Sequence, residues 1–271
     1  MFNLPEDVEC KVNSLLGWLR KQGKVVVLMS GGVDSGVLAY LSSLVLPDST
    51  YGVTVKSEYT IDECVFEASK MARLFNIPHI VLDLEMLYIK GIKDNARDRC
   101  YFCKKFIIQS VKRFADEIGF ETILEGSNID DLKGYRPGRR ALEEEGVISP
   151  FIVFNLSKKD VRLIASEAGL YFHDKPSESC LLTRFPYNME VNSSDLKRVR
   201  AAESFVKNFL NIRLVRVRDY GWWCRIEVDF KDFNFILDRS KIVGLVEGLK
   251  RLGYRYVTLD LEGYRSGSMD L

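Results

Sequence analysis

The chain has 271 residues, of which 46% are hydrophobic and 28% charged, the composition of an ordinary globular protein. Its net charge of +1 gives no reason to expect a nucleic-acid or membrane partner. Apolar runs are shorter than the roughly 18 residues of a membrane span, and the amino terminus lacks the features of a signal peptide. We therefore expect a cytoplasmic protein whose six cysteines are thiols, metal ligands or catalytic groups rather than disulfides.

Residues 5–22 have the periodicity of an amphipathic helix, and Val25–Met29 is a short β-branched run typical of a buried strand. Beyond a glycine turn, helices and strands alternate. The expected helices are Val33–Leu46, Thr60–Phe75, Leu84–Asn95, Tyr101–Ile118 and a helix from Ser157 to Gly169. The expected strands are Tyr51–Lys56, His79–Asp83, Thr122–Glu125 and a short fifth strand, Val147–Phe151. This alternation predicts an α/β fold with a parallel sheet and helices on both of its faces.

The pattern changes near residue 188, where the alternation gives way to a different order of elements. The expected helices are Asp195–Leu210, Asp232–Leu237 and Lys241–Leu252, and the expected strands are Leu214–Arg218, Arg225–Asp229 and Tyr256–Leu261. The first two strands are joined by a short connection, which is typical of an antiparallel pair. We therefore predict two domains, an α/β domain over residues 1–189 and a smaller α+β domain over residues 190–271.

The stretch Ser30–Ser35, here called the phosphate loop, reads Ser-Gly-Gly-Val-Asp-Ser between the first buried strand and the next helix. Glycines in this context let backbone N–H groups turn toward an anion, and the helix start adds partial positive charge. The loop lacks the lysine of a nucleoside-triphosphatase P-loop and the GxGxxG of a dinucleotide site. It resembles the PP-loop of ATP pyrophosphatases, which cleave ATP between the α and β phosphates. The residues proposed to bind the ATP phosphates are Ser30, Gly31, Gly32, Asp34 and Ser35.

A second loop, Glu125–Asp131, follows the fourth expected strand. Loops at the carboxyl ends of parallel strands meet at one edge of the sheet, so this loop is expected to face the phosphate loop. Gly126 and Asp131 are its candidate binding residues. Asp130 and Asp131 could hold Mg²⁺ on the pyrophosphate, or they could simply cap a helix. A basic run follows, and we weigh a phosphate-facing surface against a solvated face for it. Its members are Lys133, Arg136, Arg139 and Arg140.

Three cysteines indicate a metal site or a reactive thiol more specifically than the loops indicate a phosphate site. Cys100 and Cys103 have the CxxC spacing at which two thiolates reach one metal, and Cys180 lies in a polar, proline-bounded segment beside Arg184. Three interpretations are open: a [4Fe–4S] cluster held by all three, a zinc site, or Cys180 as a sulfur carrier with the CxxC pair resolving a disulfide. From spacing alone, zinc is the commonest use of a CxxC pair.

The smaller domain has arginines that could bind an anion. Arg216 and Arg218 alternate on one strand face, as Arg225 and Glu227 do on the next strand. Two arginines on one face suit bidentate recognition of phosphate, but spacing alone favours a solvent-facing strand pair with alternating charges. Arg265 lies in the small-residue string Gly263–Ser268, which has the character of a phosphate-binding turn or of a frayed end.

Taken together, these segments resemble the LarE family, the ATP-dependent sulfur transferases of nickel-pincer nucleotide biosynthesis. The resemblance runs nearly end to end. It rests on the phosphate loop, residues 99–104, the second loop with Tyr135–Gly138, Pro176–Tyr187, Arg225–Glu227 and Tyr256–Ser268. It implies that the enzyme adenylates a carboxylate of pyridinium-3,5-biscarboxylic acid mononucleotide, and that sulfur then replaces the adenylate to give a thiocarboxylate.

The resemblance also assigns roles to residues. One version of the family sacrifices the sulfur of a single cysteine at the position of Cys180, and another holds a [4Fe–4S] cluster on three cysteines. Because Cys100 and Cys103 accompany Cys180, the chain resembles the cluster version, with sulfide or a persulfide as donor. The expected ligands of the substrate's phosphate are Arg184, Arg216, Arg218 and Arg265, with Glu203 as a further candidate for a substrate contact.

Two other functions remain open at this point. One is a PP-loop enzyme that thiolates tRNA, although no second CxxC pair of an added zinc module is present. The other is a regulatory module that binds an adenine nucleotide without cleaving it. Members of the LarE family form hexamers, so the resemblance also implies a homo-oligomer.

Overall fold

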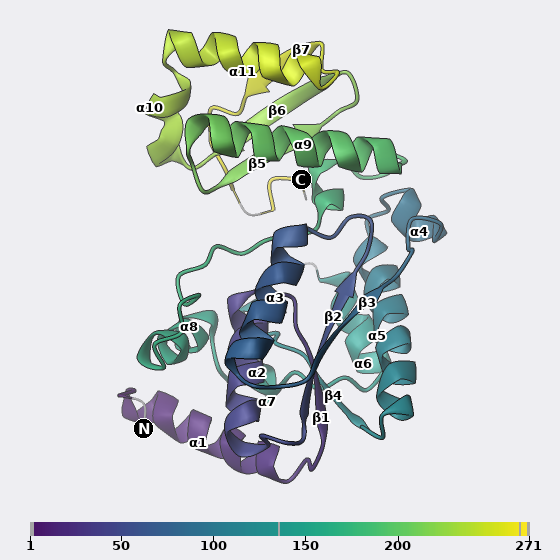
Figure 1. Cartoon of the computed structure of the whole chain (residues 1–271), viewed down its shortest axis with the longest axis vertical. Helices are drawn as coiled ribbons and strands as arrows, with labels where there is room; N and C mark the ends of the chain where they lie inside the picture. The colour runs from purple at the N-terminus through teal and green to yellow at the C-terminus, as the bar shows by residue number, and fades with distance from the viewer. Residues whose placement is uncertain (1–2, 135, 266, 270–271) are drawn as a thin grey trace. The chain divides into compact units, whose positions relative to one another are not determined.

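A computed structural model describes residues 3–134, 136–265 and 267–269. The chain forms two compact units (Figure 1). The first comprises residues 1–85 and 98–178, and the second comprises residues 86–97 and 179–271. The segment 86–97 thus belongs to the second unit although residues of the first unit flank it in the sequence. The predicted domain boundary at residue 190 stays a prediction.

The first unit contains a parallel four-stranded sheet in the order β3-β2-β1-β4, which confirms the predicted α/β fold. Its strands are β1 (Val25–Leu28), β2 (Thr50–Lys56), β3 (His79–Asp83) and β4 (Thr122–Leu124). Successive residues of β1 point to opposite faces, because side chains alternate along a strand. Val25 and Val27 are buried in one hydrophobic cluster and Val26 in another. The two faces of the sheet therefore each have a core.

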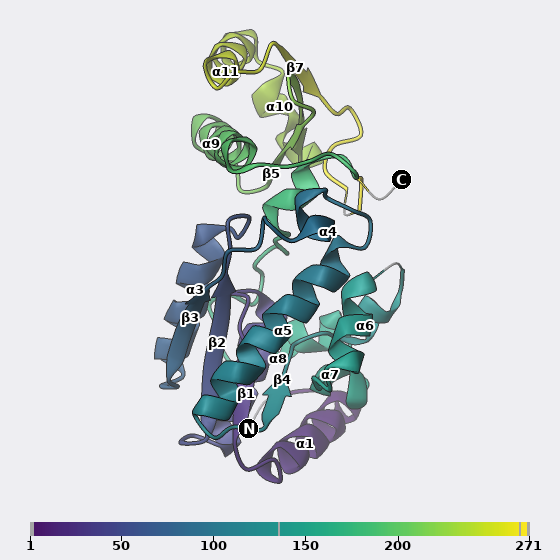
Figure 2. The ribbon, with the colours of Figure 1, turned by 90° about the vertical axis from the view of Figure 1, so that its right-hand side faces the viewer.

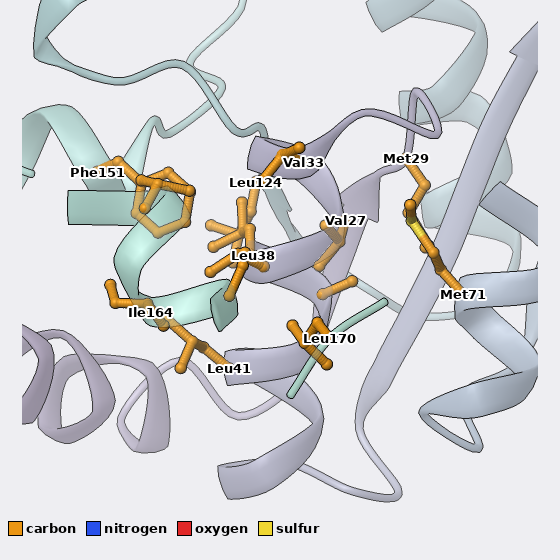
Figure 3. Packing of buried hydrophobic residues seen from close by; sticks show 14 of the residues in the cluster. Val27, Met29, Val33, Leu38, Leu41, Met71, Leu124, Phe151, Ile164 and Leu170 are labelled. Atoms are coloured by element: carbon orange, nitrogen blue, oxygen red, sulfur yellow. The ribbon is translucent and has the colours of Figure 1, made fainter. Parts of the chain in front are cut away.

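Helices cover both cores. The helices of the first unit are α1 (Glu6–Arg20), α2 (Val33–Val45), α3 (Asp62–Leu74), α5 (Arg99–Glu117), α6 (Pro137–Glu144), α7 (Pro150–Val153) and α8 (Lys158–Glu167), with the 3₁₀-helix η1 (Ile129–Leu132). Figure 3 shows Leu38 and Leu41 of α2 packed toward Phe151 and Ile164 on one face of the sheet. The opposite core includes residues of α5 and α6, and Figure 2 shows α5 running along the strands.

Two local predictions are wrong. Val147–Phe151 is not a strand: Ile148 forms a single bridge to Leu124, and Pro150 then begins the one-turn helix α7. Proline cannot donate to a ladder and suits the first turn of a helix, so pairing stops there. The helix expected over Leu84–Asn95 is reduced to α4 (Lys90–Lys93). The buried residues flanking its start, Met86 and Ile92, are six positions apart, a spacing that does not share one helical face.

The second unit has a mixed three-stranded sheet in the order β5-β6-β7, as expected for a small α+β domain. Strands β5 (Val215–Asp219) and β6 (Trp223–Val228) are antiparallel, and β7 (Tyr256–Leu259) runs parallel to β6. Its other elements are α4, η2 (Leu181–Arg184), α9 (Ser193–Leu210), η3 (Phe230–Asp232), α10 (Phe233–Ile236) and α11 (Arg239–Arg251). Asn192 begins α9 with a capping box to Asp195.

None of the helices in the described parts of the chain has the length and apolar character needed to cross a membrane.

Candidate functional site

The phosphate loop joins the carboxyl end of β1 to the first turn of α2. Ser35 donates its single hydroxyl proton to the Gly32 carbonyl at 3.2 Å. Its oxygen therefore accepts from the Ser30 N–H and the Ser30 hydroxyl, each at 3.1 Å, which ties the start of the loop to the helix. Gly32 is the N-cap residue of α2, and the first N–H groups of a helix have no acceptor within it. They are available to an anion.

Gly126 brings the second loop against this helix start. A Cβ atom at Gly126 would lie 2.8 Å from the Ser35 backbone nitrogen, so the approach requires glycine. The side-chain amide of Asn128 donates to the Asp34 carboxylate at 3.0 Å, and its backbone N–H donates to the Asp131 carboxylate at 3.1 Å. The two loops predicted from the sequence therefore form one hydrogen-bonded site.

Both loops line a cavity of about 270 Å³ at the carboxyl ends of the central strands. Its polar lining comes from the loops and from Lys104 of α5, and its apolar lining from β1, β2 and α5. The residues concerned are Leu28, Met29, Ser30, Asp34, Ser35, Val53, Val55, Lys104, Ile107, Glu125, Gly126, Ser127 and Asp131. Open parallel sheets bind their ligands at this edge. Anion-binding groups beside aliphatic side chains suit a nucleotide, whose phosphates are charged and whose base is flat and apolar.

The carboxyl group of Asp34 has a pKa that the site shifts. Burial raises the pKa of Asp34 above its ordinary value of 3.8, and the nearby Asp131 carboxylate adds to the effect. The hydrogen bond from Asn128 and the ammonium group of Lys158 oppose it. Two carboxylates in one partly buried cavity repel each other, and a divalent cation would relieve that repulsion.

The CxxC pair lies at the start of α5, where Cys100 and Cys103 are three residues apart and so are neighbours on the helix surface. Cys100 is exposed and Cys103 is half-buried. The hydroxyl of Tyr59, a buried residue in the segment after β2, donates to the Cys103 sulfur at 3.3 Å. Lys104, the next residue, lines the cavity described above. The pair therefore belongs to the same edge of the first unit.

Cys180 belongs to the second unit, where it is the N-cap residue of η2. Its side chain is half-buried, and its carbonyl accepts from the Thr183 hydroxyl at 2.9 Å and from the Arg184 guanidinium at 3.3 Å. Within the ranges that the structure describes, no three His, Cys, Asp or Glu side chains form a group that could hold a metal ion.

Arg184 is fully buried beside this turn. Its Nε and Nη2 atoms donate to the two carboxylate oxygens of Glu203 at 2.7 and 3.0 Å, a bidentate ion pair. Its Nη1 atom donates to the carbonyl and hydroxyl oxygens of Ser179 and to the Thr183 hydroxyl, each at 2.9 Å. Arg184 thus orders the turn that carries Cys180. Its role as a ligand of the substrate's phosphate stays a prediction.

The charged face, meaning the face of β5 and β6 with Arg216, Arg218, Arg225 and Glu227, is buried except at Arg225, which is half-buried. The expectation of a solvated strand pair is wrong, since Arg216, Arg218 and Glu227 are 1%, 4% and 0% exposed. Arg218 and Arg225 donate to separate oxygens of Glu227 at 2.6 and 2.9 Å. Ser268, close to the end of the chain, contacts both Arg218 and Glu227. Ser268 and Met269 lie against this face and help to bury it, which strand spacing does not indicate.

The residues of the basic run, and Arg265, are exposed and form ion pairs. Each residue of the basic run forms an ion pair with an acidic neighbour, which favours a solvated face over a phosphate-facing one. The pairs are Lys133–Asp130, Arg136–Asp131, Arg139–Glu143 and Arg140–Glu144. Arg265 is exposed and pairs with Glu262. Tyr135 and Ser266, which belong to strings that carry the resemblance, lie outside the described residues.

Sequence analysis missed two residues of the site. Asn128 bonds to Asp34, and its capping-box spacing to Asp131 was a usable signal. Lys175 donates from its ammonium group to the Gly31 carbonyl at 2.8 Å. No local pattern predicts that contact, because the two residues lie 144 positions apart.

Comparison with known proteins agrees with this geometry. The NAD synthase family matches residues 9–106, which include the phosphate loop and the CxxC pair. The pyridinium-3,5-bisthiocarboxylic acid mononucleotide synthase of Lactiplantibacillus plantarum is 33% identical over 96% of this chain and 94% of its own. The chain belongs to the LarE family.

Other similar proteins set this LarE-family chain in context. An uncharacterized protein of Synechocystis is 33% identical over 97% of this chain and 98% of its own. The tRNA-specific 2-thiouridylase of Rickettsia africae is 25% identical over 64% of this chain and 58% of its own. The likeness to the LarE-type synthase therefore extends over both units, whereas the likeness to the thiouridylase is partial.

Proposed function

We propose that this LarE-family protein is an ATP-dependent sulfur transferase. Its substrate would be pyridinium-3,5-biscarboxylic acid mononucleotide, one carboxylate of which is adenylated and converted to a thiocarboxylate. The observation that carries the proposal is the cavity that the phosphate loop and the second loop share. The chain is also related, over nearly its whole length, to the pyridinium-3,5-bisthiocarboxylic acid mononucleotide synthase of Lactiplantibacillus plantarum. The cavity supports the proposed binding and cleavage of ATP. The relationship to the synthase supports the choice of the pyridinium mononucleotide as the substrate that is adenylated.

Activation of the substrate follows from the phosphate loop. The substrate carboxylate attacks the α-phosphorus of ATP, the bond to the β-phosphate oxygen breaks, and pyrophosphate leaves. Negative charge grows on the phosphates as this happens. Hydrogen bonds of Ser30 and Ser35 fix the loop, and the first N–H groups of α2 have no acceptor within the helix. These N–H groups can therefore stabilise that charge without reorganising.

Mg²⁺ on the pyrophosphate would be held by Asp34 and Asp131. Carboxylate oxygens are the ligands that Mg²⁺ prefers, and both side chains line the cavity. The raised pKa of Asp34 fits this role, since a cation would offset its burial and the repulsion from Asp131. Mg²⁺ would neutralise phosphate charge and stabilise pyrophosphate as the leaving group.

Replacement of AMP by sulfur is assigned to the three cysteines. A sulfur nucleophile attacks the acyl carbon of the adenylate, and AMP leaves. The donor set fits a [4Fe–4S] cluster in kind: the three residues are thiols, and Tyr59 donates to the Cys103 sulfur as outer-shell groups commonly do. Such a cluster, when bound by Cys100, Cys103 and Cys180, would supply an exchangeable sulfide and allow repeated turnover. The sulfide would be received as free sulfide, or from a persulfide whose outer sulfur takes two electrons from an added reductant.

The second unit is assigned to recognition of the substrate's own phosphate. Arg184, Arg216, Arg218 and Arg265 remain the proposed ligands of that phosphate. Domains over residues 1–189 and 190–271, a cytoplasmic location and a homo-oligomer complete the proposal. The domain limits follow from the change in the order of elements near residue 188, the location from the sequence expectations given above, and the homo-oligomer from the family resemblance.

The test separates adenylation from sulfur transfer. Protein purified without oxygen and reconstituted with iron and sulfide would be given ATP, Mg²⁺ and the pyridinium mononucleotide, and pyrophosphate and thiocarboxylate measured in parallel. We expect Cys100→Ala, Cys103→Ala and Cys180→Ala to keep pyrophosphate release but to lose iron and repeated sulfur transfer. Cys10→Ala removes an exposed thiol of α1 and is the matched control.

Three outcomes contradict parts of the proposal. If Cys180→Ala binds as much iron and transfers sulfur fully, the cluster assignment fails. If pyrophosphate release depends on tRNA and not on the pyridinium compound, the protein is a tRNA-thiolating enzyme. If ATP binds but pyrophosphate is never released, it is a nucleotide-binding module.

A further inference from the structure

Lys175 reaches the phosphate loop from a distant part of the first unit. Its ammonium group donates to the Gly31 carbonyl at 2.8 Å, and the residue is half-buried. The cavity-lining residues do not include Lys175. The hydrogen bond of Lys175 to the loop is therefore made to the backbone oxygen of Gly31 and not to a residue that lines the cavity.

The base of Lys175 is fixed by α8. Arg162 of that helix donates to the His173 carbonyl at 2.9 Å and to the Lys175 carbonyl at 2.6 Å. The helix begins with a capping box at Ser157, and Ile164 is fully buried in the core. The ammonium group is thus presented to the loop from a rigid support rather than from a free surface side chain.

The peptide bond between Gly31 and Gly32 needs such a contact. Gly31 has a φ of +71°, and a Cβ atom there would lie 2.1 Å from the Cys64 carbonyl oxygen, so glycine is required. Two successive glycines leave their shared peptide bond unusually free to rotate. In a trans peptide the carbonyl and the next N–H point in opposite directions. Whatever holds the Gly31 carbonyl therefore also sets the direction of the Gly32 N–H.

We propose that Lys175 is a positioning residue that fixes the orientation of the Gly31–Gly32 peptide and so prepares the phosphate loop for ATP. A flipped peptide would exchange an N–H for a carbonyl oxygen, which repels phosphate. The contact from the ammonium group favours the unflipped form before the ligand arrives, and less binding energy is lost in ordering the loop. The inference rests on the proposed binding of ATP.

The test compares Lys175→Met, which removes the donor, with Lys175→Arg, which keeps one. Lys159→Met removes an exposed lysine of α8 and is the matched control for charge. A charge-assisted hydrogen bond is worth enough that we expect ATP affinity to fall about 10- to 100-fold in Lys175→Met. Lys175→Arg should recover most of it, and Lys159→Met should bind as the parent protein does. The amide NMR signal of Gly32 should broaden or move in Lys175→Met without ATP.

The outcomes distinguish the inference from its alternatives. Unchanged ATP affinity in Lys175→Met overturns it. Lost affinity with an unchanged Gly32 signal also overturns it and indicates that Lys175 contacts a phosphate directly. A fall in the urea midpoint with unchanged affinity for ATP indicates a purely structural contact. Failure of the parent protein to bind ATP would instead remove the proposed function, and the Gly32 signal would still report whether Lys175 sets the peptide.

Discussion

The phosphate loop of the first unit and the charged face of the second unit are both suited to anions by residue type, but they are built in opposite ways. In the loop the available donors are the first N–H groups of α2, which have no acceptor within the helix. The Ser30 and Ser35 groups that fix the loop are bonded to neutral partners, and the loop borders a cavity of about 270 Å³. On the charged face the donors are guanidinium groups that resident carboxylates already neutralise. Anion-binding capacity therefore depends on what the donors are bonded to, and not on how many there are.

The consequence is a different use of binding energy. An anion at the phosphate loop meets groups that are fixed and have no charge partner to lose. A phosphate at the charged face has to share Arg218 with Glu227, which is 0% exposed. Buried ion pairs cost much to break, because each remaining charge is left without water. Substitutions in the loop should therefore reduce activity, and substitutions that break a buried ion pair of the second unit, on the charged face or between Arg184 and Glu203, should reduce stability.

Glu203→Gln is expected to give the largest loss of stability. The change keeps the shape of the side chain but leaves the fully buried Arg184 without its counter-charge. Breaking a buried pair from one side costs about 3–5 kcal/mol in the free energy of unfolding. Urea unfolding would be followed in a Trp18→Phe background, where the remaining fluorescence comes from Trp222 and Trp223 of the second unit.

Glu190→Gln is the matched control for this measurement. Glu190 is in the same unit and pairs with Lys93 at 2.8 Å, but both side chains are about half exposed or more. Exposed pairs contribute about 1 kcal/mol or less. Equal losses in the two variants would show that the buried pair is no more important than a surface one, and the contrast between the two regions would be lost.

The order of strands and helices along the chain was predictable because each element depends on a local pattern. Alternating strands and helices, and the glycine turn after the first strand, fixed the parallel sheet and the position of the phosphate loop. The failure at Val147–Phe151 was also local: Pro150 follows the one residue that pairs, and it starts a helix. An apolar run alone does not show where pairing ends.

The surroundings of the sites were less predictable because they depend on distant parts of the chain. The spacing of Arg216 and Arg218 correctly gives a shared strand face, but the contacts of Ser268 and Met269 with this face are not indicated by that spacing. Lys175 meets Gly31 across 144 positions. Such contacts have no periodicity, so a single sequence gives no sign of them.

Asp34→Asn should change stability less and in the opposite direction. Burial raises the pKa of Asp34, so folding favours its protonated form, and the ionised carboxylate destabilises the protein as pH rises from 3.8 through the folded-state pKa. Asparagine removes that cost and its side-chain oxygen still accepts from Asn128. We expect a modest rise in the urea midpoint at neutral pH that disappears in acid, with pyrophosphate release reduced about 100-fold or more.

Trp18 provides the signal for that variant in a Trp222→Phe, Trp223→Phe background, since it lies in the first unit. Asp48→Asn, at an exposed aspartate of the same unit, is the control and should change neither quantity. A lower midpoint in Asp34→Asn at neutral pH would mean that the ionised carboxylate stabilises the loop, against the direction that burial imposes.

Arg265→Ala should have the smallest effect on stability and is the sharpest test of the second unit as a phosphate site. Its pair with Glu262 is exposed, so its loss should cost about 0.5 kcal/mol or less. Of the four arginines predicted to hold the substrate's phosphate, Arg184, Arg216 and Arg218 are buried and Arg265 is exposed. Arg265 can therefore meet a phosphate without breaking a buried ion pair.

We expect Arg265→Ala to raise the KM for the pyridinium mononucleotide with kcat unchanged, as happens when an interaction that binds substrate and transition state equally is lost. Arg251→Ala on α11 is the control and should change neither constant. An unchanged KM in Arg265→Ala would leave the buried arginines as the only predicted ligands, and substrate binding would then require the resident carboxylates of the second unit to release them.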